Sequence, residues 1–124
     1  TEAILYRDGL ISEGSSSNVM ASLNGAIITP KFGDFQNILP GAMLAFATES
    51  ARSIGISVEC RSLSVNELLQ ADEVAITSSR RILHSISALD GRSIPGGSVF
   101  ARVFDRMIAS IATAVAGEPT AAAR

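Results

Sequence analysis

Glu13-Gly14-Ser15-Ser16-Ser17-Asn18 is the stretch on which the interpretation of this sequence depends. It places a carboxylate, a glycine and three hydroxyls between two strand-like segments, Leu10–Ser12 and Asn18–Leu23. Small residues let a backbone approach a ligand closely, and serine hydroxyls and the Asn18 amide can hydrogen-bond to it. The same run is also typical of an ordinary Ser-rich turn, so alone it leaves a structural and a ligand-binding interpretation open.

Three dipeptides mark tight hairpin turns: Asp8-Gly9, Asn24-Gly25 and Asp90-Gly91. The first predicts that Ala3–Arg7 pairs with Leu10–Ser12. The second predicts that Asn18–Leu23 pairs with Ala26–Thr29, where Pro30 ends the strand. The first thirty residues are therefore predicted to form a β-meander.

Helical patterns alternate with strand patterns over the rest of the chain. A helix is predicted from Pro40 to about Gly55, a short one over Val65–Gln70 with Ser64 and Glu67 as a capping box, and an amphipathic one after Gly97. The last helix carries Val99, Val103, Met107, Ile108 and Ile111 on one side. Further strands are predicted over Ile56–Arg61, Glu73–Thr77 and Ile82–Leu89. The result is one mixed α/β (α+β) domain over residues 1–116 and a frayed, flexible tail over 117–124.

Composition excludes several classes of protein. Hydrophobic residues make up 47% of the 124, enough for a core and against disorder. Proteins that bind nucleic acid normally carry a basic face. The net charge of −2 and the pI near 5.3 do not suggest such a protein. No apolar run reaches the ~18 residues of a membrane span. A single Cys and a single His exclude an intrachain disulfide and a Cys/His metal cluster, and we expect a reducing, cytoplasmic location.

Two further segments could bind an anion. Asn37-Ile38-Leu39-Pro40-Gly41-Ala42-Met43 precedes and begins a predicted helix, where free N–H groups and the helix dipole favour negative charge. Thr77-Ser78-Ser79 ends a predicted strand, and its hydroxyl and N–H groups could hold phosphate oxygens. Taken separately, the first is an ordinary helix cap and the second an ordinary strand-end turn.

Taken together, the order, spacing and flanks of these segments resemble the class IV (fold-type IV) aminotransferases. That group includes D-amino acid and branched-chain aminotransferases and aminodeoxychorismate lyase. Glu2-Ala3-Ile4-Leu5 leading to Ser12–Met20 matches the Glu-Gly-Ser motif, Ile38–Leu44 matches the helix-start motif, and Glu73–Ser79 matches the later strand motif. The resemblance covers about residues 2–112. It implies a C-terminal cofactor domain in which a β-meander is followed by helix-strand units in a pseudo-barrel.

The resemblance also implies pyridoxal 5'-phosphate as cofactor and assigns residues to it. Glu13 takes the place of the glutamate that pairs with the ring nitrogen, and a nearby carboxylate favours the protonated ring. The implied cofactor-binding set is Glu13, Ser17, Asn18, Gly41, Ala42, Met43, Ser78 and Ser79. Met43 stands where the family has Thr, Leu44 where it has Arg, and Ser85 where it has Pro. Arg80-Arg81 also replaces residues that are usually small and polar.

Lysine is scarce: nine of the ten basic residues are Arg, and Lys31 stands alone in a Pro-Lys-Phe-Gly loop. In the family the Schiff-base lysine precedes the Glu-Gly-Ser motif. We therefore expect it upstream of Thr1, together with an N-terminal domain, and we assign no catalytic residue within this chain. Lys31 is expected to be a solvated loop residue. A homodimer is expected by resemblance.

Three other residues or pairs are assigned structural roles. His84 is expected to be a packing or edge-strand histidine, Arg80-Arg81 a surface pair and Cys60 a buried thiol, because it alternates with Ile56 and Val58. The predicted function is part of a transaminase, which moves an amino group from an amino acid to a 2-oxo acid. Two alternatives remain: a lyase of the aminodeoxychorismate type, and a non-catalytic or degenerate domain.

Overall fold

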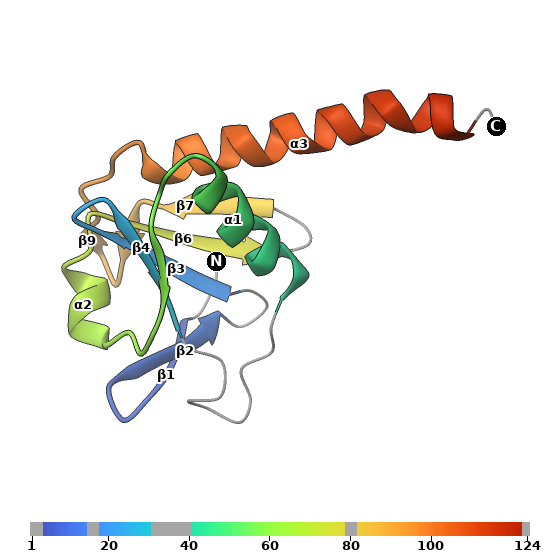
Figure 1. The fold of residues 1–124 in the computed structure, drawn as a ribbon. Coiled ribbons are helices and arrows are strands. Elements are labelled where there is room, and N and C mark those ends of the chain that lie inside the picture. The colour runs from blue at the N-terminus through green and yellow to red at the C-terminus, as the bar shows by residue number, and fades with distance from the viewer. Residues whose placement is uncertain (1–3, 15–17, 31–40, 79–81, 123–124) are drawn as a thin grey trace.

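The computed structural model describes residues 4–14, 18–30, 41–78 and 82–122. Its centre is a five-stranded sheet with the order β5-β4-β3-β6-β7 (Figure 1). The strands are β3 (Asn18–Leu23), β4 (Ala26–Thr29), β5 (Val58–Cys60), β6 (Glu73–Ser78) and β7 (Ile82–Ile86). All neighbouring pairs are antiparallel except β4 and β5, which run parallel. The predicted mixed α/β class is confirmed.

Two short hairpins flank this sheet. β1 (Ile4–Arg7) pairs with β2 (Leu10–Gly14), and β8 (Ala88–Leu89) pairs with β9 (Arg92–Ser93). All three predicted turns are present, and both residues of each have positive φ: Asp8 52° and Gly9 77°, Asn24 53° and Gly25 82°, Asp90 48° and Gly91 77°. Backbones with two successive positive φ values match the twist of a hairpin and favour Asx-Gly pairs.

The first thirty residues do not form one continuous meander. β1 and β2 make their own two-stranded sheet, whereas β3 and β4 belong to the central sheet. The β1–β2 hairpin forms backbone hydrogen bonds instead with the start of α2 (Val65–Leu69) and the residues just before it. Ile11 N donates to Leu63 O at 2.7 Å, and Val65 N donates to Gly9 O at 2.8 Å. The predicted strand Ile82–Leu89 is likewise divided between β7 and β8.

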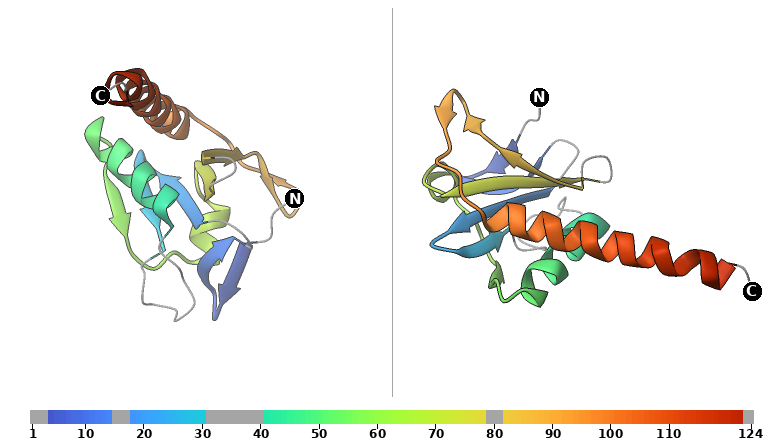
Figure 2. Two further views of the ribbon diagram at one scale, coloured as in Figure 1. Left: turned by 90° about the vertical axis from the view of Figure 1, so that its right-hand side faces the viewer. Right: turned by 90° about the horizontal axis from the view of Figure 1, so that it is seen from above.

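Helices α1 (Ala42–Ser53) and α3 (Val99–Ala122) cover one face of the sheet (Figure 2). The core beneath them is apolar; its largest members are Met20, Ile27, Leu44, Phe100 and Met107. A second apolar cluster fills the other face, under the β1–β2 hairpin, α2 and the β8–β9 hairpin, and includes Ile11, Val19, Leu63, Val74 and Ile76. Strand side chains alternate between these two clusters, as the pleat of a sheet requires.

Helix α3 is longer than predicted. It continues past Gly117 to Ala122, where the sequence predicts a frayed tail, and it extends beyond the sheet in Figure 1. Val103 and Met107 are buried as predicted, whereas Ile108 and Ile111 are exposed.

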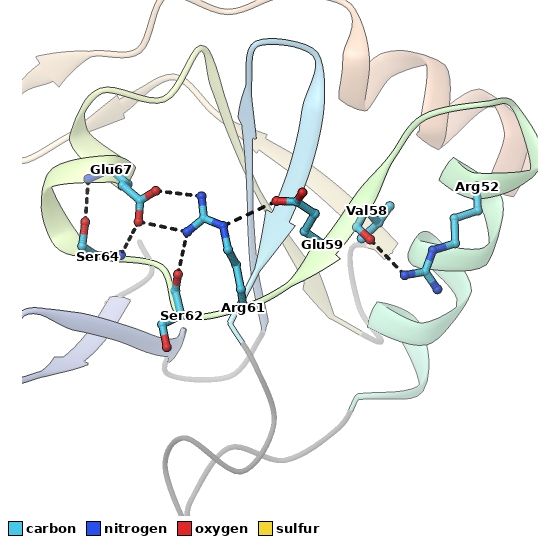
Figure 3. A network of polar contacts seen from close by, with 7 residues as sticks. All are labelled: Arg52, Val58, Glu59, Arg61, Ser62, Ser64 and Glu67. Carbon is cyan, nitrogen blue, oxygen red and sulfur yellow. Dashed lines mark hydrogen bonds and ion pairs between the residues drawn. The ribbon is translucent and has the colours of Figure 1, made fainter.

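A polar network at the surface joins β5 to α2 (Figure 3). Arg61 donates two hydrogen bonds to Glu67, at 2.8 Å and 3.2 Å, and its Nε lies 3.5 Å from Glu59. Glu67 and Ser64 form the predicted capping box, with bonds of 3.0 Å and 3.1 Å. The hydrogen bonds from Arg61 and from the Ser64 backbone hold the pKa of Glu67 below its usual range.

Candidate functional site

The Glu-Gly-Ser motif joins two strands. Glu13 and Gly14 end β2, and Asn18 begins β3 of the central sheet. Strand β2 is two residues longer than predicted, because Glu13 and Gly14 continue it. The three serines, including Ser17, and the side chain of Glu13 lie outside the described residues.

Asn18 brings this motif to the start of α1. A Cβ placed on Gly41 would collide with the Oδ1 of Asn18, so any larger residue at position 41 would require the Asn18 side chain to move. Gly41 is the N-cap of α1, with an extended backbone (φ −80°, ψ 138°) that other residues adopt freely. The requirement for glycine therefore comes from the neighbouring Asn18 and not from the backbone conformation.

The N-terminus of α1 has no local cap. Its N-cap residue, Gly41, forms no side-chain cap hydrogen bond, and the first turn holds no acidic residue. The first intrahelical bond runs from Ala45 N to Gly41 O at 3.1 Å, which leaves the N–H groups of Ala42 and Met43 without acceptors inside the helix. Ala42 is exposed, and the Met43 side chain packs partly against the core. An uncapped helix start of this kind is suited to bind an anion.

The third segment reaches the same end of the sheet through strand pairing. Thr77 on β6 is the register partner of Asn18 on β3. Alternation along β6 places Thr77 on the face covered by α1, and Ser78 on the opposite face. Ser79, Arg80 and Arg81 lie outside the described residues.

The backbone is strained directly after that segment. Ile82, the first residue of β7, has a φ of 63° and pairs with Ser78. A β-branched residue is a genuine outlier in the left-handed region, and such strain persists only where surrounding structure imposes it. Sequence patterns give no signal for this conformation, because Ile82 reads as an ordinary strand residue.

The remaining candidates stand apart from this cluster. His84 is exposed on the edge strand β7, as an edge histidine should be. Cys60 is exposed, which corrects the prediction of a buried thiol: it ends the edge strand β5, beyond the reach of the core that buries Ile56 and Val58. Lys31 lies outside the described residues. Over the described ranges, no three His, Cys, Asp or Glu side chains gather as a metal site would require.

A shallow cavity of about 220 Å³ lies elsewhere, between α1 and α3. It is lined by Phe46, Glu49, Ser50, Ser53, Arg106 and Ser110. Arg106 Nε donates to Ser53 Oγ across it at 3.2 Å. The lining residues on α1 follow its first turn and the others belong to α3, so the cavity is separate from the Asn18–Gly41 contact. In the described part of the chain, no helix has the length and apolar character needed to cross a membrane.

Comparison with known proteins identifies the family of this chain. The sequence model described as amino-transferase class IV matches residues 1–89 of the 124. The chain belongs to the class IV aminotransferase family. Relatives include a D-alanine aminotransferase of Bacillus licheniformis, 36% identical over 97 residues, covering 78% of this chain and 34% of that protein. A chloroplastic branched-chain-amino-acid aminotransferase of Arabidopsis thaliana is 35% identical, covering 73% of this chain and 22% of that protein.

Solved class IV structures share the fold. The branched-chain amino acid aminotransferase of Escherichia coli superposes with a TM-score of 0.78 at 30% identity, covering 84% of this chain and 36% of that one. The branched-chain aminotransferase of Thermoproteus uzoniensis, solved with norvaline, gives a TM-score of 0.80 at 27% identity, covering 86% and 35%. The chain thus spans about a third of the length of several of its class IV relatives.

Proposed function

We propose that this chain is the cofactor-binding part of a pyridoxal-phosphate-dependent aminotransferase, which transfers an amino group from an amino acid to a 2-oxo acid. The observation that carries the proposal is the contact between Asn18 and Gly41. Through it, and through the register of Asn18 with Thr77, three segments far apart in sequence meet at one end of the sheet. Each of these segments matches a motif of the family.

The residues present fit the cofactor's phosphate. The start of α1 offers the N–H groups of Ala42 and Met43, which have no acceptor within the helix. The proposed cofactor-binding set also includes Ser17, Asn18, Ser78, which ends β6, and Ser79, which follows it in sequence. The hydroxyl that a family Thr would add at position 43 is absent here.

Pyridoxal phosphate, when bound, supplies an electron sink for the carbanion that forms on the substrate carbon. In this proposal the carboxylate of Glu13 holds the proton on the ring nitrogen, because a negative charge beside it favours the protonated form. The N–H groups at the start of α1 fix the phosphate and thereby orient the ring. The amine that moves the substrate α-proton is proposed to come from a lysine outside these 124 residues.

Aminotransferase is favoured over lyase because the relatives that match over most of this chain are named D-alanine and branched-chain-amino-acid aminotransferases. An amino acid and a 2-oxo acid as substrates, and a homodimeric, cytoplasmic form, belong to the same proposal. They rest on the family alone.

Two experiments test the proposal. Calorimetric titration of this chain with pyridoxal phosphate should give saturable binding, and Glu13→Gln should weaken it, whereas Glu49→Gln on exposed α1 surface should not. A protein that includes a longer N-terminal segment should convert D- or L-amino acids to 2-oxo acids when an acceptor 2-oxo acid is supplied. Formation of product without an acceptor would favour the lyase, and no product from any donor would overturn the assignment to transamination.

A further inference from the structure

Two buried hydroxyls in the described residues have no hydrogen-bond partner: those of Ser22 and Thr77. Each residue is only 1% exposed. A polar group buried without a partner is rare in a folded protein and costs stability, so each one needs an explanation. The two lie toward opposite ends of the central strands, since Thr77 pairs with Asn18 and Ser22 pairs with Glu73.

Thr77 lies beneath the uncapped start of α1. Its register partner Asn18 places its side-chain oxygen against the N-cap Gly41. Helix α1 packs directly on β6, on the face to which alternation assigns Thr77. A buried hydroxyl without a hydrogen-bond partner therefore lies at the end of the sheet where α1 begins, and the first N–H groups of α1 have no acceptor within the helix.

Ser78 is placed differently. It lies on the opposite face of β6, pairs with the strained Ile82 and already has an interaction partner. Met43, at the start of α1, carries no hydroxyl. Among the described residues near the helix start, Thr77 is therefore the side chain with a hydroxyl hydrogen still to be donated.

We propose that Thr77 donates its hydroxyl hydrogen to the phosphate of pyridoxal phosphate bound at the N-terminus of α1, and so replaces the hydroxyl that Met43 does not provide. This inference rests on the proposed function, because the same phosphate is the ligand. A charged acceptor satisfies the hydroxyl and the helix N–H groups together. The stability cost of the orphan hydroxyl in the free protein is then removed on binding.

Thr77→Val tests the inference, since valine keeps the shape and removes the hydroxyl. Calorimetric titration should show pyridoxal phosphate and inorganic phosphate binding roughly 10- to 100-fold more weakly than to the unaltered chain, the size expected for one hydrogen bond to a charged group. Pyridoxal, which lacks the phosphate, should bind equally to both. Thr77→Ser, which restores the hydroxyl, should recover phosphate binding.

Ser22→Ala is the matched control, because it removes the other orphan hydroxyl at the far end of β3. It should leave phosphate binding unchanged. Without ligand, Thr77→Val should unfold at a denaturant concentration equal to or above that of the unaltered chain, which shows that any loss of binding is not misfolding. Equal phosphate affinity of Thr77→Val and the unaltered chain overturns the inference and leaves the proposed function intact. Failure of the unaltered chain to bind pyridoxal phosphate overturns both.

Discussion

The carboxylate of Glu73, on β6, accepts a hydrogen bond of 3.0 Å from the backbone N–H of Val99, the first residue of α3. A second bond, from Phe100 N, measures 3.4 Å. Helix α3 has no acidic residue in its first turn, so a side chain from the sheet performs the capping that a local residue usually provides. Glu73 is 6% exposed and thus fixes the helix to the strand from inside the fold.

Glu73→Gln is expected to lower the free energy of unfolding by ~1–2 kcal/mol, because the amide loses the negative charge at the helix N-terminus and turns a donor toward N–H groups. Urea denaturation at neutral pH measures this. Glu49→Gln, the same change at an exposed position of α1, serves as the control. Equal losses in the two variants would contradict the capping role.

Gly97→Ala is expected to destabilise the fold by ~1–3 kcal/mol through crowding. The added methyl would lie 3.0 Å from Glu73 Oε2 and 3.1 Å from its Cδ. In the Glu73→Ala background the cost of the alanine should fall close to zero, because the crowded carboxylate is gone. A double-mutant cycle by chemical denaturation checks the coupling, and additive effects of the two changes would show that the contact is not the cause.

Glu67→Gln should reveal a pH-dependent contribution to stability. The pKa of Glu67 is lowered, chiefly by the hydrogen bond from Arg61, so its contribution is present above the unfolded-state pKa and is lost as pH falls through the folded-state pKa. Since the pair is 42% and 36% exposed, the difference at neutral pH should not exceed ~1 kcal/mol.

Unfolding by urea across the acid range checks this. Glu59→Gln is the comparison, because Glu59 makes a single contact of 3.5 Å with Arg61, and it should lower stability less. A loss in Glu67→Gln that is as large in acid as at neutral pH would disprove the role of the ion pair.

Gly41→Ala should destabilise the chain by ~1–3 kcal/mol and weaken binding of pyridoxal phosphate, because the methyl group displaces the Asn18 side chain. Thermal unfolding and calorimetric titration measure the two effects. In the double variant with Asn18→Ala the stability should return while binding stays weak. If Asn18→Ala does not restore stability, the contact between these residues is not what requires glycine.

Cys60 should react with a thiol-specific disulfide reagent in the native protein, because it is exposed at the end of an edge strand. The native chain should consume one equivalent, at a rate close to that of the denatured chain. Reaction only after denaturant is added would restore the earlier prediction of a buried thiol.

Features set by neighbours in sequence were predictable. The three Asx-Gly turns, the capping box of Ser64 and Glu67, the bounds of β3 and β4 and the start of α1 all depend on residues within four positions of one another. Local preference alone determines such elements. The family was also predictable from the three motifs, because the resemblance depends only on residue types and their order in the sequence.

Other features required the tertiary structure, because they join residues distant in sequence. No local pattern shows that the first two hairpins belong to different sheets, that Glu73 caps a helix 26 residues away, or that β5 is an edge strand on which Cys60 is exposed. The same holds for the candidate site. The sequence by itself determined which three segments form the candidate site. The tertiary structure decided that Asn18 pairs with Thr77 and lies against Gly41. The physical reason is that strand register and contacts between side chains exist only between folded elements.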